Sequence, residues 1–392
     1  MSHYIQHLEC SRTAATYPPG RLYNLSPGSG APLLVRYRLE EIKLSLERNQ
    51  LAARVPSMWR YRELMPVALE EEIVSLGEGW TPLIRCANLA KKYGFLNLFM
   101  KNAAHNPTGC FKDRGLSVAV SMAKNLGARR LSIASAGNAG GALAAYGARA
   151  GLEVSVFMPA DAPRTNLQEC LVAGARVTRV GGLISDAARV MAEVGKEGGW
   201  FDVSTLKEPY RIEGKKTMGY ELAEQFGWTL PDVVLYPAGG GTGLIGMWKA
   251  FQELEELGWI GSSRPRMVAV QSSGCAPLVT AFQEGRDESD YWPGAATLAA
   301  GIRVPKALGD FLILRDIRES RGSALSVTDE EIQEAVREVA VHEGVLMCPE
   351  GAACWAALKA LRDRGEVGLE EQVVLFNTAS GHKYPEVNAG LV

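Results

Sequence analysis

VVLYPAGGGTGLIGMWKAFQEL (233–254) decides the fold class of this sequence. A short apolar strand is followed by a glycine-rich turn and then by an apolar segment of helical character. Successive glycines let backbone N–H groups converge on one point, and the N-terminus of the next helix adds positive partial charge. The stretch therefore predicts a strand–turn–helix unit of an α/β protein, with an anion-binding turn.

The same order of strand, turn and helix recurs along the chain from about residue 76. Strands that alternate with helices predict βαβ units around parallel sheets. In such sheets ligands bind beyond the carboxyl ends of the strands, where the Ser- and Gly-rich turns of this chain are expected. Further short apolar runs stand at residues 131–134, 153–159, 176–180, 267–271 and 372–376.

The composition argues against several classes of protein. Of the 392 residues, 47% are hydrophobic and 22% charged, which is ordinary globular usage rather than that of a disordered chain. Because 42 Lys and Arg stand against 44 Asp and Glu without a basic block, we expect no nucleic-acid or membrane partner. The first ten residues lack the basic and apolar regions of a secretory signal, so we expect none. The seven scattered cysteines are typical of reduced thiols in the cytoplasm.

Gly241-x-Gly243-x-x-Gly246 also fits the fingerprint of a dinucleotide-binding turn. That fingerprint needs an acidic residue at the end of the next strand, where this chain has Gln271-Ser272-Ser273. The residues therefore favour a small phosphate over a nicotinamide cofactor. A tight strand–helix connection that binds nothing stays open as the alternative.

Lys112 stands at the expected start of a helix, in NPTGCFKDRG (106–115). The helix dipole disfavours a positive charge there, and Cys110 and Phe111 would partly exclude water. Both effects lower the pKa of the amine and favour the neutral nucleophile that Schiff-base chemistry needs. A surface lysine paired with Asp113 is an equally good interpretation of these residues.

Asn138 lies in SAGNAGG (135–141), a second turn between a strand and a helix. Its amide offers both donors and an acceptor, and the glycines beside it allow a ligand to approach closely. An asparagine that stabilises its own turn explains the same residues equally well.

Five motifs in sequence order give a resemblance that covers about residues 75–390. The chain resembles the fold-type II pyridoxal-phosphate enzymes, and among them the threonine synthase family, in NPTGCFKDRG, ASAGNAGGALAAYGARAG, STLKEPYRIEGKKT, PAGGGTG and TASGHKYPE. The resemblance implies two open, mostly parallel twisted sheets with helices on both faces. Pyridoxal 5′-phosphate would lie in the cleft between a large domain (76–108 and 206–392) and a smaller mobile domain (109–205).

The resemblance also implies which residues hold the cofactor. Lys112 would be the catalytic lysine that carries it as a Schiff base. Asn138 would hydrogen-bond its phenolic oxygen, and Thr378 would face its pyridine nitrogen, where a hydroxyl moderates the electron sink. Its phosphate would be held by Gly239, Gly240, Gly241, Thr242 and Gly243.

On the substrate side, the resemblance assigns Arg211 to a phosphate group, which suits a planar guanidinium fork. A structural arginine paired with Glu208 or Glu213 is the alternative. Ser135 and Ala136 would lie near the substrate carboxylate. In the lysine loop, Cys110, Ala103 and His105 depart from the residues usual in the family, which leaves the substrate more open than the cofactor.

Residues 1–75 are predicted to form an N-terminal extension rather than a third sheet domain. One helix is expected in it, at about 39–52. Members of the resembled family often begin with a zinc ribbon held by two CxxC knuckles. Here the two positions read Cys10-Ser11-Arg12-Thr13 and Ser26-Pro27-Gly28-Ser29, and one thiolate cannot hold a tetrahedral zinc. We expect no metal there; hydrogen bonds would keep the path of the ribbon, or the segment would form an oligomer contact.

The resemblance implies a lyase of amino-acid biosynthesis, which converts O-phosphohomoserine and water to threonine and phosphate by γ-elimination and β-addition. One alternative keeps fold and cofactor but changes the reaction, to serine or threonine dehydration or to β-replacement on O-phosphoserine as in cysteate synthase. A catalytically silent binding protein is a third possibility. The expected partner is a phosphorylated amino acid, and a cytoplasmic homodimer is the family expectation.

Overall fold

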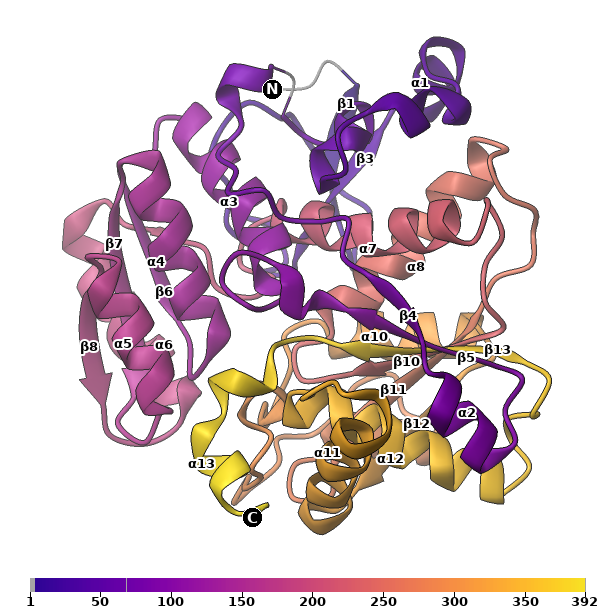
Figure 1. The fold of residues 1–392 in the computed structure, drawn as a ribbon. Helices are drawn as coiled ribbons and strands as arrows, with labels where there is room; N and C mark the ends of the chain where they lie inside the picture. The colour runs from indigo at the N-terminus through magenta and orange to yellow at the C-terminus, as the bar shows by residue number, and fades with distance from the viewer. Residues whose placement is uncertain (1–3, 68, 392) are drawn as a thin grey trace.

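The computed structural model describes residues 4–67 and 69–391, in which the strands form three sheets (Figure 1). The largest sheet lies at the lower right of Figure 1, a four-stranded sheet lies at the left, and an N-terminal sheet lies at the top. The prediction of an α/β fold with two open, mostly parallel sheets is confirmed.

The largest sheet has six strands, and all neighbours in it are parallel except the first pair along the chain. Their order in the sheet is β12 (Ser323–Val327), β11 (Arg266–Ser272), β10 (Val233–Pro237), β13 (Gln372–Asn377), β5 (Asn97–Asn102) and β4 (Leu83–Arg85). Helices α2 (Ala87–Tyr93), α11 (Asp329–Glu343) and α12 (Pro349–Asp363) cover one face, and α7 (Arg211–Gln225), α8 (Thr242–Glu256) and α10 (Asp310–Glu319) the other.

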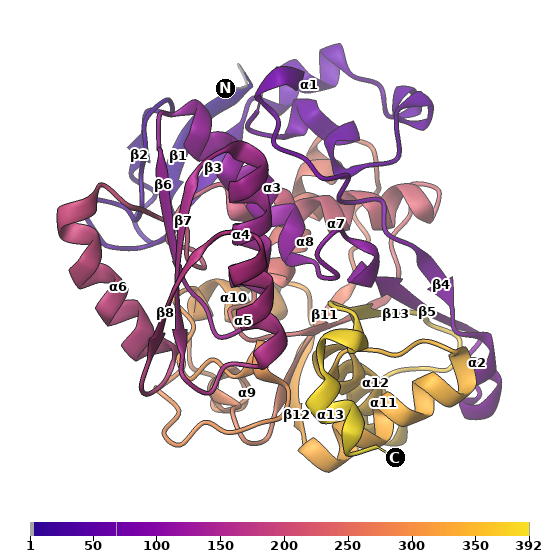
Figure 2. The ribbon, with the colours of Figure 1, turned by 60° about the vertical axis from the view of Figure 1, so that its left-hand side comes forward.

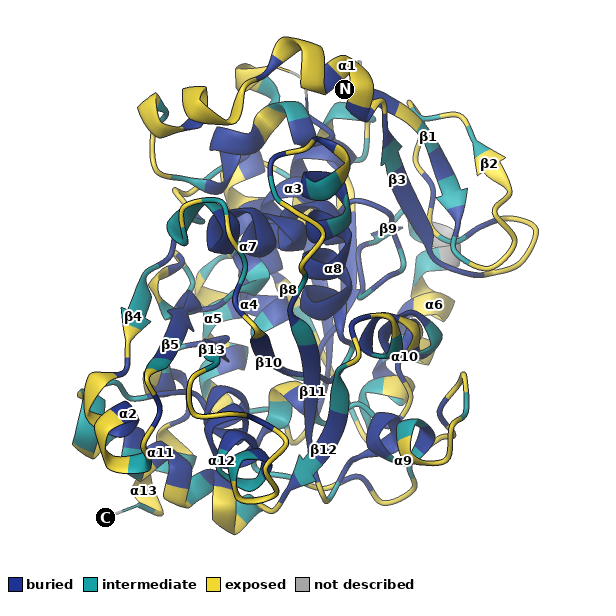
Figure 3. Cartoon of the chain, turned by 90° about the vertical axis from the view of Figure 1, so that its right-hand side faces the viewer, coloured by how far each residue is buried: buried dark blue, intermediate teal, exposed yellow. Residues whose placement is uncertain are grey.

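Burial on both faces explains why the central strand β10 is apolar at every position. Val233 and Leu235 of β10 belong to the core under α11 and α12, whereas Val234 and Tyr236 belong to the core under α7 and α8. Successive side chains of a strand point to opposite faces, so a strand covered twice needs no polar side. The central strands are accordingly buried along their length (Figure 3).

The four-stranded sheet is parallel throughout. Its order is β8 (Arg176–Val180), β7 (Glu153–Pro159), β6 (Arg130–Ala134) and β9 (Phe201–Asp202). Helices α3 (Lys112–Asn125), α4 (Asn138–Ala150) and α5 (Arg164–Val172) pack on one face, and α6 (Ile184–Gly198) packs on the other (Figure 2). The strands of this sheet lie within the expected smaller domain, 109–205, and those of the six-stranded sheet lie outside it.

The N-terminal extension contains a sheet that the sequence did not predict. Three antiparallel strands, in the order β2 (Thr16–Tyr17), β1 (Ile5–Cys10) and β3 (Leu33–Tyr37), pack against α7 and α8. The register shifts between Ile5 and His7, which breaks the alternation by which a strand is recognised in a sequence. The sequence predicted an extension with one helix rather than a third sheet domain, and this small sheet was not part of the prediction.

The helix predicted at about 39–52 is two helices. α1 (Leu39–Ser45) ends where Leu46 adopts an extended backbone and turns its side chain into the core, and the 3-10 helix η1 (Arg48–Ala53) follows. The remaining helices are η2 (Met58–Leu64), η3 (Glu70–Glu72), η4 (Ala103–His105), α9 (Pro277–Gln283), η5 (Ala300–Ile302), η6 (Gly381–Lys383) and α13 (Pro385–Ala389). Among the described residues, no helix is long and apolar enough to cross a membrane.

Candidate active site

A cavity of about 360 Å³ lies at the carboxyl ends of strands from both parallel sheets. The turn after β6 lines it on one side, and the turns after β10 and β13 line it on the other. This is where an open α/β sheet binds ligands. Of the predicted site residues, the cavity brings together Lys112, Ser135, Ala136, Asn138, Gly239, Gly240, Gly241, Thr242 and Thr378.

Lys112 is the first residue of α3, as the sequence predicts. The turn before it is held from the C-terminal region, because the amide of Phe111 donates to the carbonyl of Thr378 at 2.9 Å. The carboxylate of Asp113 accepts from the amide and hydroxyl of Thr108, with the amide at 2.7 Å, rather than pairing with Lys112. The interpretation of Lys112 as a surface lysine paired with Asp113 is therefore wrong.

The surroundings of Lys112 lower the pKa of its amine to about 8. Burial is the largest cause, and the positive charge of Arg211 acts in the same direction. Cys110 and Glu350 have the opposite effect and raise the pKa of Lys112. A lysine with this pKa exchanges protons near neutral pH far more readily than an exposed one.

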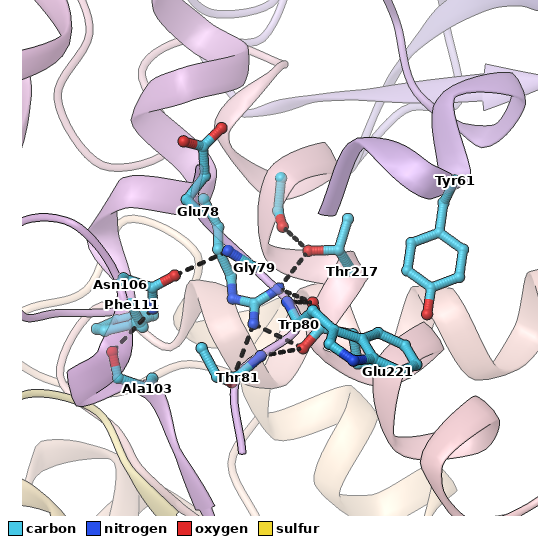
Figure 4. Close-up of polar contacts among 12 residues, drawn as sticks. Tyr61, Glu78, Gly79, Trp80, Thr81, Ala103, Asn106, Phe111, Thr217 and Glu221 are labelled. Atoms are coloured by element: carbon cyan, nitrogen blue, oxygen red, sulfur yellow. Dashed lines mark hydrogen bonds and ion pairs between the residues drawn. The ribbon is translucent and has the colours of Figure 1, made fainter. Parts of the chain in front are cut away.

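Behind the lysine turn, a buried network of charges joins α3 to α7 (Figure 4). The guanidinium of Arg114 donates two hydrogen bonds to the carboxylate of Glu221, one of them at 2.7 Å, and Lys101 donates a third at 2.7 Å. Burial raises the pKa of Glu221, but Arg114 and Lys101 outweigh it and lower that pKa to about 2. The carboxylate thus stays charged and ties the two helices together.

The same network fixes the segment that precedes the six-stranded sheet. Glu221 accepts from the amides of Trp80 and Thr81, at 2.6 and 3.2 Å. Asn106, in the lysine turn, accepts from the amide of Gly79 at 3.0 Å and donates to the carbonyl of Ala103 at 2.8 Å, as Figure 4 shows. Residues far apart in the sequence therefore hold the start of α3 in one position.

Close packing between α3 and α7 depends on Gly214. A Cβ atom there would lie 1.9 Å from the carbonyl oxygen of Arg114, so any side chain would push the helices apart. Because α3 begins at Lys112 and α7 begins at Arg211, this approach also brings these two residues near each other.

Arg211 is 1% exposed and lies behind the residues that line the cavity. One guanidinium nitrogen, Nη1, donates to the carbonyl of Val203 at 2.8 Å, while Nε and Nη2 are buried without a hydrogen-bond partner. Glu208 accepts from the backbone amide of Arg211, and Glu213 pairs with Lys216 and Lys249. Arg211 forms no ion pair with either glutamate, so its free donors are available to an anion.

Asn138 is the first residue of α4, and its Nδ2 donates to the hydroxyl of Tyr384 at 3.0 Å. Its Oδ1 is buried without a hydrogen-bond partner. The side chain therefore points away from its own turn, contrary to the local interpretation. Ser135 behaves differently, because its hydroxyl donates to the carbonyl of Gly137 and accepts from nearby amides of the same turn.

The glycine turn has no room for side chains. A Cβ on Gly240 would lie 2.9 Å from the Thr205 side chain, and one on Gly241, whose φ is +63°, would lie 2.1 Å from that of Ile313. Gly243 is not among the residues that line the cavity, and a Cβ there would meet the Tyr236 hydroxyl at 1.9 Å. Gly243 thus supports the turn from behind.

Two groups of cavity residues were missed at the level of the sequence. Glu350 and Tyr384 line the cavity from the C-terminal part of the chain. Lys207, Arg303 and Lys306 add positive charge to its lining. Lys207 lies inside the STLKEPYRIEGKKT motif and Tyr384 inside TASGHKYPE, so these two residues could have been found from the motifs. Glu350 and Arg303 lie in none of the five motifs. His105 and His382 are exposed.

In the N-terminal extension, the two segments that replace the knuckles lie side by side. The thiol of Cys10 lies 3.0 Å from the hydroxyl of Ser29. Burial raises the pKa of Cys10, but hydrogen bonds with Ser29, Thr13 and Ser26 outweigh it and lower that pKa to about 6. Hydrogen bonds connect the two segments here, and the described residues contain no group of three or more His, Cys, Asp or Glu that could hold a metal ion.

Comparison with known proteins gives consistent results. The chain matches the family described as pyridoxal-phosphate dependent enzyme over residues 74–379. It is 37% identical to threonine synthase of Methanocaldococcus jannaschii over 358 residues, which cover 91% of this chain and 88% of that protein. It is also 37% identical to threonine synthase of Methanosarcina acetivorans over 382 residues, covering 97% and 93%.

Solved structures share the fold at lower identity. Threonine deaminase isoform 2 from Solanum lycopersicum has a TM-score of 0.67 and 20% identity, covering 88% of this chain and 94% of that chain. Maize serine racemase has a TM-score of 0.66 and 21% identity, covering 79% and 92%.

Proposed function

This chain belongs to the pyridoxal-phosphate-dependent enzymes and, among them, to the threonine synthases, and we propose that the cavity converts O-phosphohomoserine and water to threonine and phosphate. The chain is thus a lyase, and its cofactor is pyridoxal phosphate. The observation that carries the site assignment is that one cavity holds Lys112, Asn138, Thr378 and the glycine turn.

The residues of the cavity fit the cofactor on two observations. The turn from Gly239 to Thr242 presents backbone at the start of α8 where side chains have no room, which suits a phosphate group. Asn138, which lines the cavity with Lys112, keeps one Nδ2 hydrogen and its buried amide oxygen without a partner, which suits a polar ring substituent. We assign the cofactor's phosphate to Gly239, Gly240, Gly241 and Thr242, with Gly243 supporting the turn.

When bound, pyridoxal phosphate supplies an electron sink for negative charge that develops on the substrate. Lys112 takes and returns protons at Cα and Cβ of the substrate, for which a pKa of about 8 is suitable. Thr378 lines the cavity, and its hydroxyl would face the ring nitrogen, where it would form no ion pair and so would moderate the sink. Ser135 and Ala136 lie beside the substrate carboxylate, in the turn that opens α4.

The substrate's phosphate is bound by Arg211, whose Nε and Nη2 are buried and unpartnered. Lys207, Arg303 and Lys306 attract the same anion into the cavity. Residues 109–205 act as the smaller domain and close over the substrate, which keeps water from the reactive carbon until it is needed. Besides the buried pair of Arg114 with Glu221, the described residues join that segment to the rest of the chain through the ion pairs of Asp161 with Arg303, at 3.2 Å, and of Glu169 with Lys383.

The test is release of phosphate from O-phosphohomoserine, O-phosphoserine and O-phosphothreonine in parallel, with the organic product identified. The proposal expects phosphate and threonine from O-phosphohomoserine, and neither from a Lys112→Ala variant. Phosphate from O-phosphoserine alone would instead indicate a β-replacement enzyme. Deamination of unphosphorylated serine or threonine without any use of phosphoesters would indicate a dehydratase.

We also propose that the enzyme is a homodimer and works in the cytoplasm, where threonine would be made. Light scattering of the purified protein tests the first statement, because a monomer would have the mass of one 42.3 kDa chain. Cell fractionation tests the second.

A further inference from the structure

Glu350 is the one acidic side chain among the described residues that line the cavity. It lies in the first turn of α12 and is 3% exposed. Its Oε1 accepts from the backbone amide of Gly301 at 2.6 Å, whereas its Oε2 is buried without a hydrogen-bond partner. A buried carboxylate oxygen without a hydrogen-bond donor destabilises the fold, so we expect a donor to pair with this atom.

Tyr384 is the neighbouring hydroxyl of the cavity and is 6% exposed. It receives a hydrogen bond from Nδ2 of Asn138 at 3.0 Å, so its own proton remains to be donated. Burial and then the negative charge of Glu350 raise the pKa of Tyr384 well above its usual value. The hydroxyl therefore keeps its proton, and the Glu350 carboxylate lies close enough to act on it.

The direction of these hydrogen bonds follows from the chemistry of the three groups. An ionised carboxylate only accepts, a hydroxyl both donates and accepts, and an amide can present either its oxygen or its NH₂. Oε2 of Glu350 lacks a hydrogen-bond partner, so the orientation that the carboxylate favours for the Tyr384 hydroxyl is the one that donates toward it. Its oxygen then accepts, which selects the NH₂ of Asn138 rather than the amide oxygen.

We propose that Glu350 is a positioning residue that fixes, through Tyr384, the orientation of the Asn138 amide toward the cofactor. The proposal rests on the proposed function only in taking Asn138 as the contact of the cofactor's phenolic oxygen. Nδ2 carries two hydrogens, of which Tyr384 takes one, and the other is free to donate to that oxygen. Glu350 thus acts on the cofactor from a distance, without touching the reacting atoms.

This role differs from a direct effect of the Glu350 charge on Lys112, which lines the same cavity. If the three residues act as one chain, removal of Glu350 or of the Tyr384 hydroxyl breaks the same connection, and the two effects are not additive. If Glu350 acts on Lys112 alone, the two effects add.

The experiment uses the holoenzyme and the variants Glu350→Gln, Tyr384→Phe and both together. The absorption spectrum of the bound cofactor, the affinity of the apoprotein for the cofactor, and the thermal midpoint are measured. Gln can donate as well as accept, so it no longer forces the direction, and Phe removes the hydroxyl. We expect each single variant to shift the absorption maximum in the same direction and to weaken cofactor binding about fivefold. The double variant should match the single ones.

A matched control is Tyr93→Phe, since the hydroxyl of Tyr93 donates to Glu338 between α2 and α11, away from the cavity. It should leave the spectrum and the cofactor affinity unchanged. An unshifted spectrum in either cavity variant, or additive effects in the double variant, would overturn the proposal. A wild-type enzyme that binds the cofactor but releases no phosphate from O-phosphohomoserine would refute the proposed function and leave this inference standing.

Discussion

Two lysines with lowered pKa values, the buried Lys101 and the cavity-lining Lys112, lie in differently built surroundings on either side of the lysine turn. Burial is the largest cause of a lowered pKa for each amine, to about 8 in both. Lys101 donates to the carbonyl of Thr81 at 2.6 Å, to Glu221 at 2.7 Å and to Gln225 at 2.8 Å. Lys112 faces the cavity, where its contact among the described residues is the ring of Phe111.

The same contrast holds for the groups around each lysine. In the network behind the turn, Arg114 donates two hydrogen bonds to Glu221, and of this pair only Nε of Arg114 lacks a partner. In the cavity Asn138 and Glu350, and behind its lining Arg211, each keep a buried polar atom without a partner. A buried polar atom without a hydrogen-bond partner lowers the stability of the fold. We therefore infer that the paired residues behind the turn hold the helices in position, whereas the unpaired residues at the cavity bind ligands.

The strongest test of this comparison is Lys112→Ala. We expect turnover of O-phosphohomoserine to fall by about 10⁴-fold, because both proton transfers and cofactor attachment depend on this amine. The free energy of unfolding of the apoprotein should not fall by more than about 1 kcal/mol, since the side chain has no charged partner to leave behind. Loss of stability without loss of activity would show that Lys112 supports the fold rather than the reaction.

On the paired side, Glu221→Gln should show the opposite pattern. It leaves the charges of Arg114 and Lys101 uncompensated in the interior, so the free energy of unfolding should fall by about 4 kcal/mol. Urea denaturation of the apoprotein measures it. The matched control is Glu193→Gln on the exposed face of α6, where loss of the pair with Arg189 should cost less than about 0.5 kcal/mol. Equal effects of the two substitutions would contradict a structural role for the network.

Arg211→Ala should act on binding rather than on stability. We expect kcat/KM for O-phosphohomoserine to fall about 100-fold, the effect of losing charge-assisted hydrogen bonds to a phosphate. Arg211→Lys should recover part of it, since the charge returns without the fork. The spectrum of the bound cofactor should not change. An unchanged kcat/KM would show that Lys207, Arg303 and Lys306 bind the phosphate without Arg211.

Local sequence placed the cavity residues that follow strands in turns at the sheet edge, but it left open whether they bind a ligand, which only the family resemblance implied. Lys112, Asn138 and the glycines stand in turns between a strand and a helix, and parallel strands bring such turns to one edge whatever the rest of the chain does. Glu350 could not be predicted in this way, because its place opposite Tyr384 depends on how α12 packs against the six-stranded sheet. Gly243 shares the glycine pattern of its neighbours, yet it lies in the first turn of α8, where it faces Tyr236.

The N-terminal sheet was missed for a related reason. The buried residues of β1 are Ile5, Leu8 and Cys10, with a spacing of three and then two, because of the register shift in this strand. Its partner β3 has four buried residues out of five and reads as a short apolar run. What identifies both as strands is their pairing and their packing on α7 and α8, which is information that the local pattern lacks.

The mildest test uses pH to separate the two lysines. With its pKa lowered to about 8, the amine of Lys112 is mostly protonated below pH 8 and mostly neutral above it. The rate at which apoprotein binds pyridoxal phosphate should therefore fall about tenfold for each pH unit below 8 and level off above it. Lys101→Met should keep that profile, because its amine faces Glu221 and not the cavity. A profile that moves with Lys101, or one that rises steadily to pH 10, would mean that the neutral amine of Lys112 does not limit binding.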